Sequence, residues 1–201
     1  MRNIAITMRE DFLVDRSETR YSVDIRLLSF VQAIGFNPIL IHNHIRNKFD
    51  LENILKNSDI HGCILSGGND LGKCAKRDQT ETWLIEFMLQ NSFPILGICR
   101  GMLMIGNYFG VESVAIQGHV AKDHIIKNRS SQKRKVNSYH NWILPTCPAN
   151  FKVTEISEDG SIEAIQHNYQ PVEGWMWHPE RTTCFDQVDL LNATNLFKGA
   201  K

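Results

Sequence analysis

The chain has 201 residues, 42% of them hydrophobic and 22% charged, a composition typical of a globular protein with one sizeable core. Its 22 basic and 22 acidic residues give zero formal net charge, which argues against general nucleic-acid binding. No run reaches the ~20 apolar residues of a membrane span, and the first residues lack the apolar stretch of a signal peptide, so a cytoplasmic protein is expected.

In chain order, the first half alternates between strand-like and helix-like segments. Residues 3–8 predict a strand, 19–34 a helix, 37–42 a strand, 50–57 a helix, 61–68 a strand, 80–90 a helix, 93–99 a strand and 100–109 a helix. This alternation predicts βαβ units and an α/β fold with a mostly parallel central sheet in a single domain over residues 1–201.

The second half consists mainly of short β-like segments. They are VESVAI, SYHNWI, FKVTEIS, SIEAIQH and GWMWH, and EDGS between two of them is a turn signal. We expect these segments to add antiparallel pairing to the same domain.

Cys99 ends one apolar run and begins a predicted helix, within Gly97-Ile98-Cys99-Arg100-Gly101. A thiol at such a strand-to-helix turn is exposed to ligand, and the helix N-terminus favours its thiolate form. The G-x-C-x-G pattern corresponds to a nucleophile elbow made with cysteine. A buried apolar side chain at the end of a strand is the alternative for this residue.

His178 and Glu180 supply a candidate base and its orienting carboxylate. In an extended segment residues i and i+2 point to the same side, so the two side chains lie together. A histidine and a glutamate with no shared task are the alternative. The turn SGGND, with Gly67 and Gly68, offers backbone amides for an oxyanion, as does the amide of Arg100; a tight turn requiring positive φ explains the same glycines.

These segments together resemble the class I glutamine amidotransferase-like superfamily and its gamma-glutamyl hydrolase branch. The matching pieces are SGGND, GICRGM, VNSYHNW, DGSIEAI and GWMWHPE, in the family's order. The resemblance implies a three-layer α/β sandwich with a strand-to-helix nucleophile elbow. It also implies a Cys99–His178–Glu180 triad acting on γ-glutamyl amides, oxyanion amides from Gly68 and Arg100, and glutamyl binding by Ser138, Tyr139 and His140.

One position departs from that family. The usual motif, CxGxQ, has glutamine where this chain has Leu103, and leucine cannot hydrogen-bond to the amino-acid end of a substrate. Binding of glutamine in the standard pose is therefore in doubt.

A basic segment over residues 122–140 leads into the SYH motif. Lys127, Arg129, Lys133 and Arg134 are its candidate phosphate ligands, since phosphates bind where lysine and arginine converge. A solvated basic loop is the alternative. The phosphate interpretation predicts a polyanionic leaving group such as a nucleotide diphosphate, and hence a γ-glutamyl nucleotide phosphoramidate as substrate.

Metal and cofactor sites are not expected. The five cysteines lack paired CxxC spacing, which predicts reduced thiols, and His119, His124 and His167 show no metal-ligand spacing. The expected reaction is cysteine-dependent hydrolysis of a γ-glutamyl C–N bond in a small molecule, with no nucleic-acid or membrane partner. One alternative is a glutaminase subunit that delivers ammonia to a synthetase partner; the other is a catalytically inactive binding or regulatory domain.

Overall fold

A computed structural model describes residues 2–199, so Met1 and the last two residues of the expected domain lie outside it. Its main sheet has nine strands in the order β4-β1-β5-β6-β13-β12-β11-β8-β9. The parallel part comprises β1 (Asn3–Thr7), β4 (Asn37–Ile41), β5 (Ile60–Leu65), β6 (Ile95–Ile98) and β13 (Val172–Trp175). The antiparallel part adds β8 (Val120–Asn128), β9 (Lys133–Tyr139), β11 (Phe151–Ser157) and β12 (Ile162–His167).

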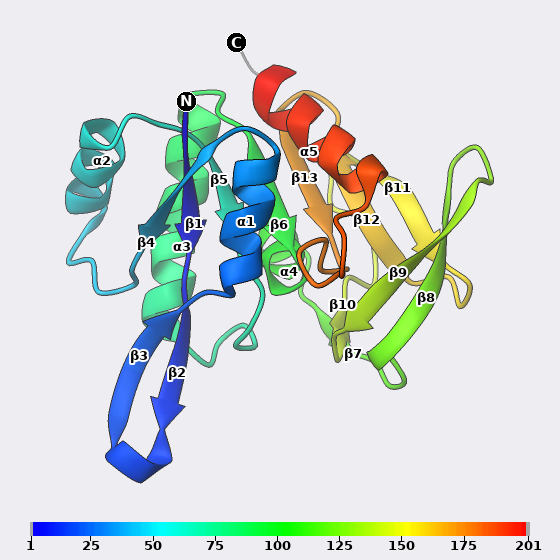
Figure 1. Ribbon diagram of the computed structural model, residues 1–201, viewed down its shortest axis with the longest axis horizontal. Helices are drawn as coiled ribbons and strands as arrows, with labels where there is room; N and C mark the ends of the chain where they lie inside the picture. The colour runs from blue at the N-terminus through cyan, green and yellow to red at the C-terminus, as the bar shows by residue number, and fades with distance from the viewer. Residues whose placement is uncertain (1, 200–201) are drawn as a thin grey trace.

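Helices cover both faces of the sheet, which confirms the expected three-layer α/β sandwich (Figure 1). Helices α1 (Ile25–Ala33) and α5 (Gln187–Gly199) pack on one face, where their buried side chains join one apolar cluster. Helices α2 (Lys48–Asn57), α3 (Ala75–Gln90) and α4 (Arg100–Tyr108) contribute to the cluster on the other face. The strands between them are buried on both sides, which explains their continuous apolar runs.

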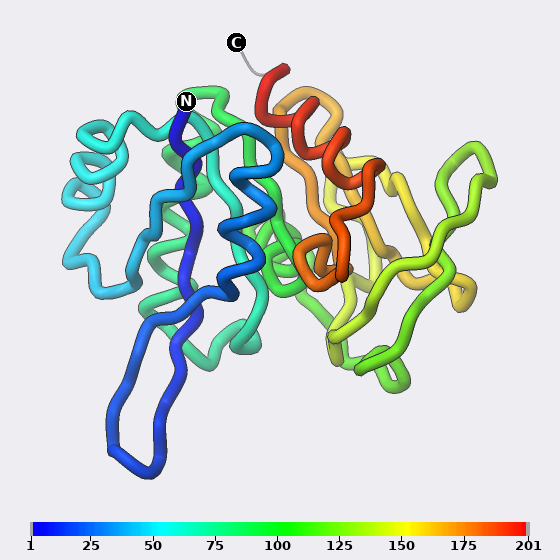
Figure 2. Tube along the Cα trace, viewed as in Figure 1, coloured from blue at the N-terminus to red at the C-terminus, as the bar shows by residue number. Residues whose placement is uncertain are grey.

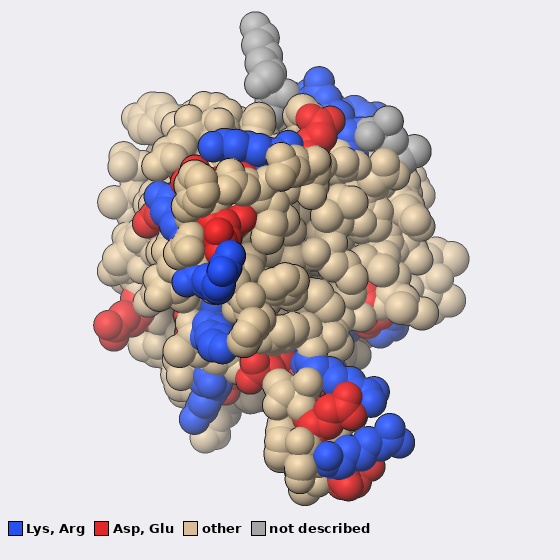
Figure 3. Space-filling model, turned by 90° about the vertical axis from the view of Figure 1, so that its left-hand side faces the viewer, with Lys and Arg blue, Asp and Glu red and all other residues tan. Residues whose placement is uncertain are grey.

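The segment 19–34 differs from the expected helix. Residues 18–22 form β3 (Glu18–Ser22), which pairs with β2 (Arg9–Leu13) through the short 3₁₀ turn η1 (Val14–Arg16), and the helix begins only at Ile25. The Asp24 carboxylate accepts from the Arg26 amide and so caps α1, a helix-start signal that competes with continuous helical spacing. The β2–β3 hairpin projects from the carboxyl edge of the sheet (Figure 2) and mixes acidic and basic side chains on its surface (Figure 3).

The basic segment also has regular structure. Residues 120–139 form the β8–β9 hairpin at the edge of the main sheet, and the short strands β7 (Val114–Ala115) and β10 (Trp142–Ile143) pair separately beside it. The five cysteines are free. Within residues 2–199, no helix has both the length and the apolar character needed to cross a membrane.

Candidate active site

Cys99 occupies a strained turn between β6 and α4. Its φ of 52° and ψ of −109° lie in a region that few residues other than glycine adopt. Its amide donates to the Trp175 carbonyl at 2.7 Å, which joins the turn to β13. Strain of this kind persists where the surroundings fix it, and it is typical of nucleophilic turns.

The two glycines around Cys99 have a steric reason. A Cβ at Gly97 would lie 2.5 Å from the Gly101 carbonyl oxygen, and a Cβ at Gly101 would lie 2.0 Å from the Leu65 oxygen. The start of α4 therefore rests directly on the backbone of β5 and β6. The close approach leaves no room for a side chain at either glycine.

His178 lies beside Cys99 and is oriented by Glu180. The His178 Nδ1 atom is 2.7 Å from Glu180 Oε1, and both side chains are buried. Burial alone would lower the pKa of His178, but hydrogen bonds to Cys99 and Glu180, together with the charges of both groups, raise it to about 9. The imidazole is thus held in its charged form at neutral pH, and a neighbouring cation favours thiolate at the sulfur.

The backbone of His178 is held by Asn137 of β9. The Asn137 side-chain nitrogen donates to the His178 carbonyl at 2.8 Å, and its oxygen accepts from the His178 amide at 2.9 Å. Sequence reasoning missed this residue, because the contact joins positions 41 apart. Its only local signal is its place directly before the SYH motif.

The SGG turn after β5 is held from behind by Arg77 of α3. The guanidinium donates to the carbonyls of Ser66, Gly67 and Gly68 at 2.6, 3.1 and 2.6 Å. Since the N–H of a trans peptide points opposite to its C=O, the amides of Gly67 and Gly68 face away from Arg77. Within residues 2–199 those two amides donate to no protein acceptor.

Gly67 itself lies against the other two members of the site. A Cβ at Gly67 would be 2.7 Å from His178 Cε1 and 3.7 Å from the Cys99 Cβ. Gly68 has φ +85°, and Arg9 of β2 covers it. Both explanations of this turn therefore hold at once: the backbone needs glycine, and the glycines border Cys99 and His178.

Arg77 belongs to a buried charge network beneath the turn. Arg77 Nε is 3.0 Å from Glu81, and the Arg100 guanidinium hydrogen-bonds both Glu81 and Asp78. Burial alone would raise the pKa of Glu81, but the charges of Arg100 and Arg77 hold it below its ordinary value. The signal for this network is Glu81 on the helix face that carries Leu84, Ile85 and Met88; sequence reasoning did not use it.

Two cavities border Cys99 and His178. The first, of about 120 Å³, is lined by Cys99 together with Leu103, Tyr139, His140 and Trp142, among others, and we call it the Cys99 cavity. The second, of about 230 Å³, is called the His178 cavity; its lining includes His178, Glu180, Gly67, Arg9 and Arg181. The two cavities therefore lie on either side of the Cys99–His178 pair.

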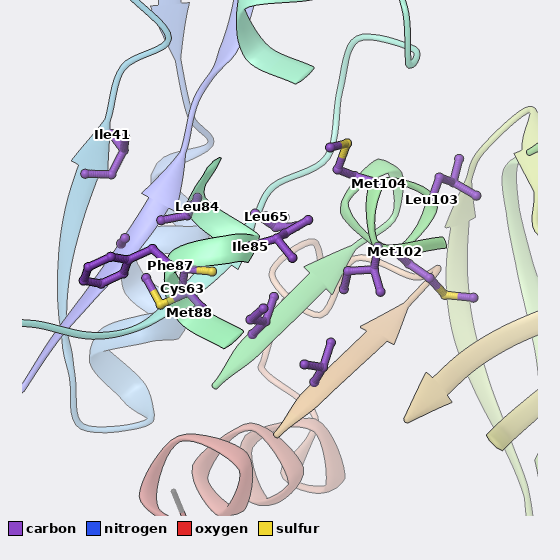
Figure 4. Packing of buried hydrophobic residues seen from close by; sticks show 14 of the residues in the cluster. Ile41, Cys63, Leu65, Leu84, Ile85, Phe87, Met88, Met102, Leu103 and Met104 are labelled. Atoms are coloured by element: carbon purple, nitrogen blue, oxygen red, sulfur yellow. The ribbon is translucent and has the colours of Figure 1, made fainter. Parts of the chain in front are cut away.

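The SYH segment and Leu103 bear on the Cys99 cavity. Tyr139 and His140 line it, whereas Ser138 is buried, and its hydroxyl donates to the His119 carbonyl. Figure 4 shows Leu103 on a different side of α4 from Met102, which lies over β13. Leu103 is only 4% exposed, so the position where the resemblance expects glutamine is an apolar wall.

The four basic residues expected to bind phosphate do not reach this site. Lys133 pairs with Lys127 beside the turn of the β8–β9 hairpin (Figure 1), six residues and about 20 Å of strand before Tyr139. Arg129 donates to a carbonyl of β11, and Arg134 binds Asp189 and Glu155. None of the four lines either cavity. This geometry corrects the expected phosphate site.

The fold and the site define an α/β protein with a cysteine at a strand-to-helix turn and a histidine–glutamate pair beside it. Residues 27–193 match the family Glutamine amidotransferase class-I. The chain belongs to the class-I glutamine amidotransferase family.

Individual relatives fall into two groups. The chain is 35% identical over 138 residues to gamma-glutamyl-CDP-amidate hydrolase of Campylobacter jejuni, which covers 66% of this chain and 68% of that protein. It is 28% identical over 144 residues to a subunit of the glutamine-hydrolyzing GMP synthase of Methanocaldococcus jannaschii, over 68% of this chain and 73% of that one. A solved structure from Thermotoga maritima, a glutamine amidotransferase, superposes with a TM-score of 0.65 at 14% identity, over 89% of this chain and 76% of that one, and shows the shared fold.

Proposed function

We propose that this chain hydrolyses a γ-glutamyl C–N bond, with Cys99 as nucleophile, His178 as acid and base, and Glu180 as the carboxylate that orients His178. The observation that carries the proposal is the strained Cys99 turn hydrogen-bonded to a buried, charged His178, with a cavity on each side of the pair. A nucleophile, a base and an orienting group within reach of one another are the minimum for covalent acyl transfer.

The reaction has two halves. The Cys99 thiolate attacks the γ-carbonyl carbon, and the C–N bond breaks as the His178 imidazolium gives its proton to the leaving nitrogen. A γ-glutamyl thioester and a neutral imidazole remain. His178 then takes a proton from water, the hydroxide adds to the thioester, and glutamate leaves with return of the thiolate.

The amides of Gly68 and Arg100 would stabilise the tetrahedral oxyanion. Arg100 is the first residue of α4, where a backbone N–H has no acceptor within the helix. The Gly68 amide faces away from Arg77, whose guanidinium fixes the peptide planes of the turn. Donors held in place before the reaction stabilise developing charge without reorganisation.

We assign the γ-glutamyl group to the Cys99 cavity and the leaving group to the His178 cavity. The smaller cavity is of amino-acid size, and the larger one contains the imidazole that protonates the leaving nitrogen. Its arginines, Arg9 and Arg181, replace the hairpin lysines and arginines as the candidate phosphate ligands. Arg9 is ion-paired with Asp11, and Arg181 stacks on the Tyr139 ring, so both guanidinium groups are already positioned at the cavity.

The specific substrate that we propose is γ-glutamyl-CDP-amidate, the compound in the name of the Campylobacter jejuni relative. Two arginines suit a diphosphate, and the apolar Leu103 argues against ordinary glutamine. Hydrolysis would give glutamate and a cytidine diphosphoramidate, a product of the kind that capsule phosphoramidate synthesis consumes.

A glutaminase subunit is the second candidate, favoured by the similarity to the GMP synthase subunit of Methanocaldococcus jannaschii. It would use the same three residues but would pass ammonia to a synthetase partner. Activity of the isolated chain separates the two functions, because a glutaminase subunit depends on its synthetase.

The test is a hydrolysis screen of the isolated chain with glutamine, a γ-glutamyl polyamine, a γ-glutamyl peptide and γ-glutamyl-CDP-amidate. We expect the nucleotide to have the highest kcat/KM. Arg9→Gln and Arg181→Gln should each raise KM for the nucleotide about tenfold, the value of one charge-assisted hydrogen bond, and leave glutamine hydrolysis unchanged. Lys127→Gln, at the hairpin turn, is the matched control and should behave like the wild type.

Equal effects of the two arginine variants on all substrates would reject the phosphate site. Activity only in the presence of a synthetase would support the glutaminase subunit instead. No hydrolysis of any γ-glutamyl compound and no thioester would support an inactive binding domain.

A further inference from the structure

Three histidines surround a buried glutamate beside the SYH segment. His119 precedes β8, His124 lies in β8, His140 follows β9, and Glu163 lies in β12. Glu163 is fully buried, and His119 and His140 are each 4% exposed. Candidate ligand atoms of His119, His140 and Glu163 all lie within 4.8 Å of one another, and His124 Nδ1 is 4.0 Å from Glu163 Oε1.

Hydrogen bonds on the outer side of two rings define their tautomers. His119 Nε2 is 2.7 Å from Asp159 Oδ2, and His140 Nδ1 is 3.1 Å from the Trp142 carbonyl oxygen. Both oxygens are acceptors, so these nitrogens carry the protons. In neutral rings the other nitrogens, His119 Nδ1 and His140 Nε2, then present lone pairs.

Those lone pairs face a carboxylate. His140 Nε2 and His119 Nδ1 are 3.6 and 4.0 Å from Glu163 Oε1, beyond normal hydrogen-bond length. Neither nitrogen and neither Glu163 oxygen has a hydrogen-bond partner among residues 2–199. Buried acceptors that face one another in this way are costly unless a cation lies between them.

We propose that His119, His124, His140 and Glu163 bind one Zn²⁺ ion. Imidazole nitrogens with one carboxylate are zinc ligands, whereas calcium and magnesium prefer oxygen alone. Bonds of about 2.0 Å in a tetrahedron separate the ligand atoms by about 3.3 Å, and the 3.6–4.0 Å spacing here needs only a small contraction. Asp159 and the Trp142 carbonyl orient two of the rings, as partners of metal-bound histidines do.

The ion would act by holding the substrate-binding segment in place. The His119 carbonyl accepts from the Ser138 hydroxyl and the His140 amide, and the Glu163 carbonyl accepts from the Met176 amide, two residues before His178. One ion therefore ties the SYH segment to the strands beside His178. Four protein ligands complete a tetrahedron and leave no position for a reacting water. The ligands come from four places along the chain, which is why sequence spacing did not predict a metal.

The test is the metal content of the whole chain, purified without chelators from zinc-supplemented cells. We expect about one zinc per chain by elemental analysis, and a tetrahedral absorption spectrum after cobalt replaces zinc. Glu163→Gln and His140→Gln should weaken Zn²⁺ binding at least a hundredfold in a competition titration. His61→Gln, an exposed histidine on β5, is the matched control and should retain the metal.

Cys99→Ala should also retain the metal, which separates this site from the active-site thiol and keeps the test independent of the proposed reaction. Wild-type chain with less than a tenth of an equivalent of zinc, and with no binding of added micromolar Zn²⁺, would overturn the proposal. Undiminished zinc in Glu163→Gln would overturn it as well. If a ligand variant fails to fold, the cobalt spectrum of the wild type decides: an octahedral spectrum contradicts the site.

Discussion

Asn137 and the backbone of His178 form a two-way hydrogen-bonded pair, with one bond donated and one accepted by the same amide side chain. The pair links β9, which leads into the SYH segment, to the residue that we propose as acid and base. Substrate binding and proton transfer are thereby fixed to one strand.

Asn137→Ala should lower kcat at least tenfold, because small displacements of a catalytic group are costly even when the group itself is present. KM should change less. Steady-state kinetics with the best substrate from the screen measures both. Asn57→Ala, exposed at the end of α2, is the control. Equal kcat in Asn137→Ala and the wild type would show that the pair does not position His178.

The pH dependence of Cys99 alkylation should report the charge of His178. The pKa of His178 is raised to about 9, so the imidazolium persists at lower pH and is lost as the pH rises through that value. With iodoacetamide at pH 6.5, His178→Asn should therefore react roughly 100-fold more slowly at Cys99, because an ordinary thiol is about 1% ionised there.

The ratio of the two rates should approach one above about pH 9, where an ordinary thiol also ionises. Peptide mapping by mass spectrometry separates Cys99 from the exposed Cys184, which serves as the internal control. A ratio near one at every pH would contradict the ion pair.

Arg77→Met should destabilise the fold by about 3–5 kcal/mol, since it leaves Glu81 buried with one cation fewer. It should also lower kcat, because the SGG turn loses the guanidinium that binds its three carbonyls. Denaturant unfolding and steady-state kinetics measure the two effects. Arg20→Met, on the exposed β2–β3 hairpin, should change neither. Unchanged stability of Arg77→Met would contradict this role.

Gly67→Ala should lower kcat about 100-fold while the chain still folds, because the new methyl group meets the His178 ring rather than backbone. Gly199→Ala has no atom within 4 Å and is the control. Circular dichroism checks that both variants fold. Wild-type kcat in folded Gly67→Ala would show that the imidazole has room to move.

The sequence was informative where a function depends on neighbouring residues. Cys99 between two glycines and His178 two residues before Glu180 are local patterns, and the structure brings these side chains together. The alternation of strands and helices likewise predicted the sheet, because parallel strands and their helices have different apolar periods.

The remaining features depend on contacts between distant segments. Arg77 meets the SGG turn across a helix–strand junction, and Asn137 meets His178 between two strands. The histidine–glutamate cluster combines residues from positions 119 to 163. The basic segment misled because charge density predicts solvent exposure or anion binding equally well, whereas the hairpin register placed its cations away from Cys99.

The most direct measurement is a rapid-quench reaction with γ-glutamyl-CDP-amidate, followed by peptide mapping. We predict one γ-glutamyl group bound to the peptide that contains Cys99, together with release of glutamate, and no turnover by Cys99→Ala. A γ-glutamyl group on another cysteine, or full hydrolysis by Cys99→Ala, would contradict the proposed reaction.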